Sequence, residues 1–313
     1  QWNMSNLNNN GLTSPFNRTA RFNSALPDFS SLFEKSTQKT DGGLGYLAND
    51  NFDTMFYQAW AFNQPLDWGD KFNNNQSYNF EKMFRSAFSF NQPINWNVKV
   101  YNVNECFYHA KDFNQSISNW QLSNLNPNYG LRSTFREAYS FDQNLNSWDV
   151  STLRQFNDSA GTSYRGIAFN DTFKETRNFT NGGVPLNWGE NLSHFINPSD
   201  GKMNGGYNDM FYRSNYNHDL KPWHDAGFFN TLTSAAHLRM LPSAYNHSLR
   251  GWNNYPFGTH IWNILYPDPG CMFSAANWDD TIIWLNEQLT GGAEFRNPNG
   301  SYAGLYLQLS SSK

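Results

Sequence analysis

The side chains that could carry acid–base, metal or redox chemistry in this 313-residue chain are seven histidines and two cysteines. A catalytic or metal-bound histidine needs partners at a fixed spacing, as in the HExxH pattern, and no such spacing occurs. A GxSxG turn, a glycine-rich phosphate loop and a CxxC pair are also absent from the sequence. The sequence therefore predicts a protein that is not an enzyme and needs no cofactor.

Three acidic stretches offer the oxygen ligands that Ca²⁺ prefers. They are NDNFD at 49–53, NPSDGKMNGGYND at 197–209 and NWDD at 277–280. None has the spacing of an EF-hand loop or its closing bidentate Glu. We interpret them as loop and cap residues and predict no metal site.

Composition and charge exclude two further classes of partner. The net charge is −4 and no run of Lys or Arg occurs, so there is no basic stripe for a nucleic acid. No stretch of about 18 apolar residues is present, so we expect no transmembrane segment. The chain begins with Gln1 rather than Met, and we expect a secreted chain, extracellular or on the cell surface, whose signal peptide has been removed.

An internal repeat must position most of the remaining side chains. Four clear copies are MFYQAWAFNQPLDW (55–68), MFRSAFSFNQPINW (83–96), CFYHAKDFNQSISNW (106–120) and TFREAYSFDQNLNSW (134–148). Weaker copies occupy 210–223 and 240–252, another begins near Cys271, and the frame is hard to follow between 156 and 205. The predicted core of the repeats is Phe56, Trp68, Phe84, Trp96, Phe107, Trp120, Phe135, Trp148, Phe211, Trp223 and Trp252.

Each copy combines two periodicities. In MFxxA the apolar residues are three and four apart, which predicts a short helical turn. In segments such as Ile94, Trp96 and Val98 they alternate, which predicts a short strand. One copy cannot bury its own apolar face, but stacked copies can. The pattern therefore predicts an α/β solenoid with short parallel strands and short helical turns, capped at both ends.

We divide this continuous domain into five segments. An N-terminal cap is expected over 1–48, regular solenoid repeats over 49–155 and irregular, insertion-rich repeats over 156–205. Degenerate repeats are expected over 206–285, and a cap segment with the strand-like LYLQL over 286–313.

The repeat resembles that of the BspA-like surface proteins, relatives of the leucine-rich repeats, whose unit reads approximately MFxxAxxFNQxLxxWxVSxVxxM. SFNQPINWNVKVYNV (89–103) and SFDQNLNSWDVSTL (140–153) carry the resemblance most closely. It covers 51–153 well and 206–280 loosely. The resemblance implies a leucine-rich-repeat-like fold and a non-enzymatic surface role in adhesion, contact or assembly.

An Asn recurs at the turn of each copy. Buried backbone groups must be paired, and a short amide suits this duty, so we predict a turn ladder in which these side chains bond to the next copy. Its members are Asn63, Asn91, Asn114, Asp142, Asn217 and Asn246. The next position holds Gln in four copies and His218 or His247 in two, so we interpret these histidines as hydrogen-bonding spacers.

Ten Asn-x-Ser/Thr sequons occur, a modest excess over chance. The best candidates for N-glycosylation lie in polar, loop-like stretches and are Asn75, Asn178, Asn191 and Asn299. Three other sequon residues, Asn114, Asn170 and Asn246, are predicted to be buried at the turn and unmodified.

The two cysteines, Cys106 and Cys271, lie several repeats apart. Stacked strands add about 5 Å each, whereas a disulfide requires Cα atoms within about 7 Å. We expect no intramolecular disulfide. Cys106 holds a position that Met fills in other copies and is predicted to be a buried apolar residue.

These observations leave two functional hypotheses. The first is an extracellular or cell-surface structural protein that binds copies of itself or other surface proteins and stacks into a filament, sheath or coat. The alternative is an adhesin that uses exposed aromatic and Asn side chains to hold a glycan or a partner protein.

Overall fold

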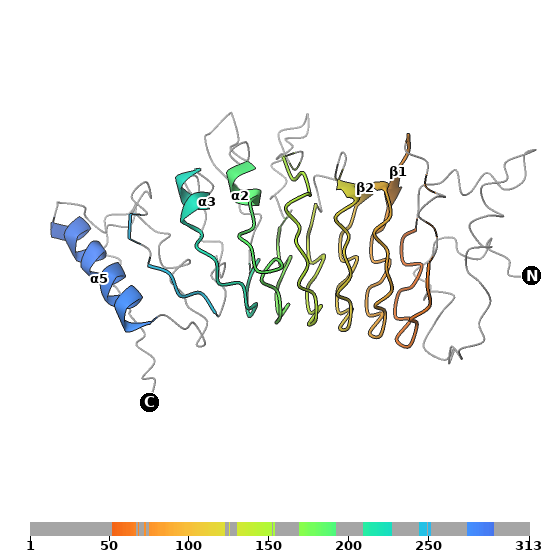
Figure 1. Cartoon of the computed structure of the whole chain (residues 1–313), viewed down its shortest axis with the longest axis horizontal. Coiled ribbons are helices and arrows are strands. Elements are labelled where there is room, and N and C mark those ends of the chain that lie inside the picture. Colours follow the sequence, from red (N-terminus) through yellow and green to blue (C-terminus); the bar gives the residue numbers. More distant parts are fainter. Residues whose placement is uncertain are drawn as a thin grey trace, which may run out of the picture.

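The computed structural model describes residues 52–66, 68, 72, 75–122, 125, 130–151, 153, 169–191, 209–226, 244–248, 250–251 and 274–290. These residues form an elongated row of stacked repeats, with the N-terminal repeats at one end and a long helix at the other (Figure 1). We number the repeats by the Phe of their MFxxA-like segments. Repeats 1 to 6 contain Phe56, Phe84, Phe107, Phe135, Phe173 and Phe211.

Three short parallel strands join the first repeats along one side of the stack. They are β1 (Ser77–Asn79), β2 (Val98–Asn102) and β3 (Trp120–Leu122), in the order β1-β2-β3. Val98 pairs with Trp120, and Tyr78 pairs with Val100. Side chains in β2 alternate between buried and half-buried, which is the period of a strand with one face on the core.

The MFxxA segments are successive turns and not the helical turns that their apolar spacing predicts. In repeat 2, Lys82 and Ser86 adopt the left-handed conformation, with φ of 52° and 59°, and interrupt any helix. Their N–H groups donate to the carbonyls of Asn104 and Tyr108 in the next repeat at 2.9 and 2.8 Å. The same two positions are left-handed in all six repeats. The hydrogen bonds of these residues therefore join repeats instead of closing a helix.

Aromatic rings form three columns through the core. In the first column, the Phe rings of repeats 1 to 6 lie 5.3 to 5.7 Å apart between successive centroids. A second column runs from Phe62 to Tyr216 with spacings of 5.6 to 6.2 Å. The third contains the Trp that ends each repeat. Stacked pairs of this kind contribute about 0.5–1.5 kcal/mol each beyond their burial, so the columns hold the repeats together.

Repeat 5 is complete, although the sequence pattern did not reveal it. Phe173 stacks on Phe135 at 5.7 Å, and Trp188 closes the repeat by stacking on Trp148 at 6.3 Å. Thr176 stands where other repeats have Ala, and its hydroxyl donates to the carbonyl of Phe135 at 2.5 Å. A buried hydroxyl is tolerated here because it has this partner.

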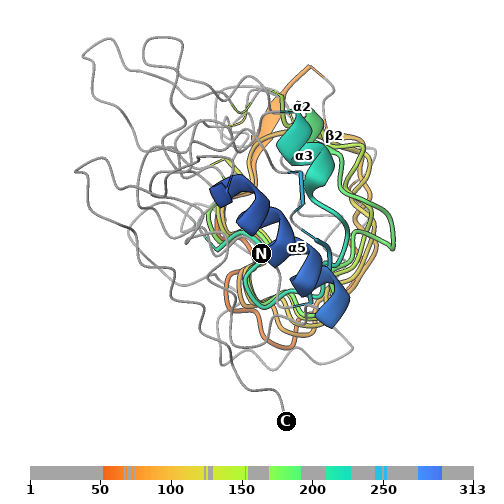
Figure 2. The ribbon, with the colours of Figure 1, turned by 90° about the vertical axis from the view of Figure 1, so that its left-hand side faces the viewer.

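The described part of the later repeats contains the helices α2 (Trp188–Asn191), α3 (Lys221–Asp225) and α5 (Ala275–Thr290). In repeats 5 and 6 a Leu precedes the closing Trp. The short helices α2 and α3 begin after this Leu and include the Trp. Helix α5 crosses the end of the stack (Figure 2). It occupies residues expected to form the last degenerate repeats and the start of a cap strand. None of the helices in the described part of the chain is long and apolar enough to cross a membrane.

Candidate binding face

The MFxxA turns carry a stripe of alternating aromatic and cationic side chains on the outside of the stack. We call it the first stripe. It consists of the residue after each Phe, namely Tyr57, Arg85, Tyr108, Arg136, Lys174 and Tyr212. The guanidinium carbons of Arg85 and Arg136 lie 4.6 and 5.0 Å from the ring centroid of Tyr108. These are cation–π distances, so the stripe is internally packed across repeats.

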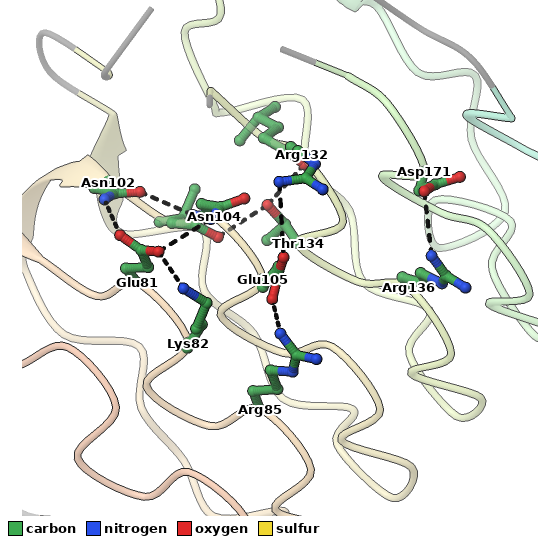
Figure 3. Close-up of polar contacts among 12 residues, drawn as sticks. Glu81, Lys82, Arg85, Asn102, Asn104, Glu105, Arg132, Thr134, Arg136 and Asp171 are labelled. Atoms are coloured by element: carbon green, nitrogen blue, oxygen red, sulfur yellow. Dashed lines mark hydrogen bonds and ion pairs between the residues drawn. The ribbon is translucent and has the colours of Figure 1, made fainter. Parts of the chain in front are cut away.

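Carboxylates lie behind the cations of this stripe (Figure 3). Glu105 pairs with Arg85 of the preceding repeat and lies 3.9 Å from Arg132 of the next. The Arg132 side chain is 40 % exposed, against 11 % for Glu105. Arg136 bonds to Asp171 at 3.2 Å in the same way. Glu105 is therefore largely covered by Arg85 and Arg132, whereas Asp171 is nearly as exposed as Arg136, at 23 % against 29 %.

A polar cluster at the start of repeats 2 and 3 fixes the turns there (Figure 3). Glu81 accepts hydrogen bonds from the amides of Asn102 and Asn104 at 3.1 and 3.2 Å and pairs with Lys82 at 2.5 Å. Burial and the nearby carboxylate of Glu81 raise the pKa of Asp53 to about 6, although Lys82 opposes this. The cluster therefore positions the turns and holds the carboxylates of Asp53 and Glu81 close together.

A second stripe lies four residues after the Phe of repeats 1 to 5 and differs from the first in its ion pairing. It consists of Trp60, Phe88, Lys111, Tyr139 and Arg177. Trp60 is 39 % exposed and stacks on Phe88 at 5.7 Å with the rings 3° apart. The Lys111 ammonium lies 4.5 Å from the Phe88 centroid, and the Arg177 guanidinium 4.7 Å from that of Tyr139.

His109 lies between the two stripes. Its ring is 4.8 Å from Phe88 and 6.2 Å from Tyr139, and Nε2 is 3.7 Å from the carboxylate of Glu137. Burial lowers the pKa of His109, and Lys111 and Arg85 act in the same direction, while Glu137 opposes them. His109 is therefore held neutral near pH 7 and packs as an aromatic ring.

The Asn residues of the turn bond from repeat to repeat. Oδ1 of Asn63 accepts the N–H of Asn91, and Oδ1 of Asn91 accepts the N–H of Asn114, both at 2.9 Å. The same contact joins Asn114 to Asp142 at 2.9 Å, and Asn217 to Asn246 at 2.8 Å in the later repeats.

The residue after each of these Asn bonds to the preceding repeat. Gln115 Nε2 donates to Oδ1 of Asn91 at 2.9 Å. His218 and His247 place Nε2 3.1 and 2.9 Å from backbone carbonyls of the preceding repeat. Both histidines therefore make the contact of a hydrogen-bonding spacer. The side chain of His224 and the whole of His194, His237 and His260 lie outside the described residues.

The Trp that ends each repeat is buried, and in repeats 2 to 6 its indole N–H donates to a carbonyl of the preceding repeat. The indole N–H of Trp120 donates to the carbonyl of Ile94 at 2.8 Å, and that of Trp223 donates to Leu186 at 2.8 Å. The predicted core residues Phe56, Trp68, Phe84, Trp96, Phe107, Trp120, Phe135, Trp148, Phe211 and Trp223 are all at most 5 % exposed. Trp252 lies outside the described residues.

The sequon residues fall in different settings. Asn75 and Asn178 are exposed, whereas Asn299 and the side chain of Asn191 lie outside the description. Asn114 and Asn246 are half-buried, not buried as predicted, because each turn keeps one side in solvent.

Asn170 was wrongly placed at the turn. It lies three residues before Phe173, and Thr180 holds the turn position, where its N–H donates to Asp142 at 2.6 Å. Cys106 is buried with a free thiol, and Cys271 is outside the described residues.

Sequence reasoning missed both stripes. Neither is visible along the chain, because each repeat contributes one residue to a stripe. The alignment of the repeats is the signal that could have found them. The position four residues after each Phe holds, in order, Trp, Phe, Lys, Tyr, Arg and Asn.

Two stretches of the chain, residues 46–131 and 94–184, match a family model described as "Mycoplasma protein of unknown function, DUF285". The matches overlap over 94–131, as expected when a repeated unit fits the model in two registers. Together they span repeats 1 to 4 of the stack and part of repeat 5. The comparison thus supports a repeat protein similar to this family. No curated protein and no solved structure matches the chain.

Proposed function

We propose that this chain is a non-enzymatic repeat scaffold, extracellular or on the cell surface, that binds a partner along the face carrying the two stripes. The observation that carries the proposal is the second stripe, in which aromatic rings and cations from five successive repeats meet on one surface. Exposed aromatic and Arg side chains are the types that dominate binding energy at interfaces. The resemblance to BspA-like surface proteins supports the surface location, and the match to the family model supports the repeat architecture.

Stacking of copies into a filament has less support. An end-to-end contact would use the exposed ends of the stack. At the C-terminal end, helix α5 bonds to the last described repeat: Asn277 Nδ2 donates to the carbonyl of Asn246 at 2.6 Å, and Arg250 pairs with Glu287 at 2.7 Å. A second copy would have to displace this helix, so binding along the side is favoured.

Binding of the labelled full chain to a panel of intact cells and matrix-coated plates tests this proposal. The variant W60S/K111Q/R177Q removes the exposed ring and both cations of the second stripe. The control K99Q changes a cation on strand β2, outside both stripes. We expect saturable binding that the triple variant weakens at least about tenfold while K99Q leaves it within about twofold. Absence of binding to every surface would overturn the proposal, as would equal binding by all three proteins or filaments in sedimentation velocity.

A further inference from the structure

The two stripes differ in how their cations are neutralised. Arg85 and Arg136 of the first stripe pair with carboxylates, and so does Lys174, which bonds to Asp209 at 2.7 Å. Among the described residues, by contrast, neither Lys111 nor Arg177 has a carboxylate within 4 Å. A cation over a ring keeps most of its charge available to a ligand. The second stripe therefore carries uncompensated positive charge on a protein whose net charge is −4.

The rings of the second stripe add to this positive character. Trp60 and Phe88 cover one another's faces, and the Lys111 ammonium and the His109 ring lie against Phe88. The electron-rich faces that make these contacts are thus used within the stack and are less available to a ligand than the ring edges. The edge of an aromatic ring is the positive part of its quadrupole. The surface consequently suits an anionic ligand.

The neighbouring position supplies polar groups for a hydroxylated ligand. Ser89 and Ser140 follow the second stripe by one residue and are half-buried, and no described group bonds to either hydroxyl. Their N–H groups donate to the carbonyls of Trp60 and Lys111 at 3.1 and 3.0 Å. The backbone donors here are already used, so a peptide cannot add as a strand, which is a common mode of peptide recognition.

We propose that the second stripe binds a linear anionic polysaccharide, whose recurring carboxylate or sulfate groups meet Lys111 and Arg177 and whose hydroxyls meet Ser89 and Ser140. The site repeats along the stack instead of converging on a pocket, and a polymer with regularly spaced charges matches such a site. This proposal rests on the proposed function and specifies its ligand. Asp112 is exposed beside Lys111 and opposes anion binding, so its removal should strengthen the interaction.

Biolayer interferometry with the full chain tests the proposal. The immobilised probes are polygalacturonate, dextran sulfate, neutral dextran and poly-L-glutamate. We expect binding to one or both anionic polysaccharides and none to dextran. K111Q/R177Q should weaken it about tenfold, K99Q should change it less than about twofold, and D112N should tighten it about twofold. Raising the salt from 0.05 to 0.5 M should weaken it further, because the screening length shortens from above to below about 10 Å. Identical melting curves exclude loss of folding.

The outcomes separate this inference from the proposed function. Polysaccharide binding that is equal in all variants would refute the second stripe as the site. Binding to poly-L-glutamate alone would refute the polysaccharide and leave the scaffold proposal standing. If no polymer binds but W60S/K111Q/R177Q abolishes cell binding, the polysaccharide is refuted in the same way and the scaffold proposal stands. Failure of both assays would overturn both proposals.

Discussion

The turn contact between Asn91 and the next repeat allows a sharp test, because the chain contains its own natural variant. Oδ1 of Asn91 accepts two hydrogen bonds, from the N–H of Asn114 and from Gln115 Nε2, each at 2.9 Å. Two repeats further along, the same role passes to Asp142, which accepts the N–H of Thr180 at 2.6 Å and its hydroxyl at 2.9 Å. A carboxylate can therefore replace the amide, since only an acceptor oxygen is needed. We predict that Asn91→Asp is tolerated and Asn91→Ala is not.

The size of the effect follows from what each variant leaves unpaired. Asn91→Ala removes both acceptor contacts. The amide of Gln115 is half-buried and can turn to water, so its loss costs little. The N–H of Asn114 is fixed by the turn, and leaving a buried donor unpaired costs about 1–3 kcal/mol. Because Asn114 is also half-buried, we take the lower half of this range, about 1–2 kcal/mol.

Amide hydrogen exchange at Asn114 is the direct assay, because urea unfolding of a repeat array need not be two-state. Since 1.4 kcal/mol corresponds to a factor of ten, exchange at Asn114 should accelerate by about five- to thirtyfold in Asn91→Ala and change little in Asn91→Asp. Exchange in repeat 6, away from the substitution, serves as the internal control. Equal acceleration in the two variants would show that the amide, and not the acceptor oxygen, matters. Unchanged exchange in Asn91→Ala would show that the turn contact contributes nothing.

Three further perturbations are predicted. A Cβ on Gly189 would collide with the indole of Trp223, so Gly189→Ala should cost about 1–3 kcal/mol by overpacking, measured as a lower melting temperature. Burial raises the pKa of the Cys106 thiol, so iodoacetamide should modify Cys106 only after the chain unfolds. Peptide mass spectrometry measures this modification, and rapid modification of the folded chain would contradict the burial of Cys106. The pKa of Asp53 is raised from 3.8 to about 6 by burial and Glu81, so the folded state holds this proton more tightly. The contribution of protonated Asp53 to the free energy of unfolding is complete below pH 3.8 and is lost as the pH rises through about 6. Asp53→Asn should therefore remove this part of the pH dependence of thermal unfolding.

The core was predictable because it depends on residue type alone. Phe84, Ala87 and Trp96 recur at nearly constant spacing in the first four repeats, and any stack of such copies must bury them. The turn conformation was not predictable in the same way. Turns closed by i to i−3 hydrogen bonds, such as Ala87 to Phe84 at 3.0 Å, produce the same three- and four-residue spacing as a helix. The choice between the two depends on left-handed residues such as Ser86, whose type does not require that conformation.

Repeat 5 was hidden because its substitutions change polarity while conserving the contact. Thr172 takes a position that Met holds in other repeats, and its hydroxyl donates to the carbonyl of Leu131 at 3.1 Å. Asn181 and the glycines that follow it lengthen the turn, so the distance from Phe173 to Trp188 exceeds that in every other repeat. A search that requires the same apolar residues in every copy therefore misses repeat 5. A search for the hydrogen bond that each repeat makes to its neighbour finds it.

The same reasoning explains why a chain with net charge −4 can present a cationic surface. Stacking places one residue of each repeat in a row, so the charge of a stripe depends on a single column of the alignment and not on the whole composition. The column four residues after the Phe of repeats 1 to 5 contains two cations and no acid, while carboxylates such as Glu105 occupy another column and lie deeper. Moving one charge between columns should therefore change binding even at constant net charge. K111S/S89K keeps both composition and net charge but shifts the cation from the second stripe to the adjacent column. If the position of the charge governs binding, this variant should lose anionic-polymer affinity about as fully as K111Q. Retention of the affinity of the unmodified chain would mean that total charge decides, and the ordered stripe would have no role in recognition.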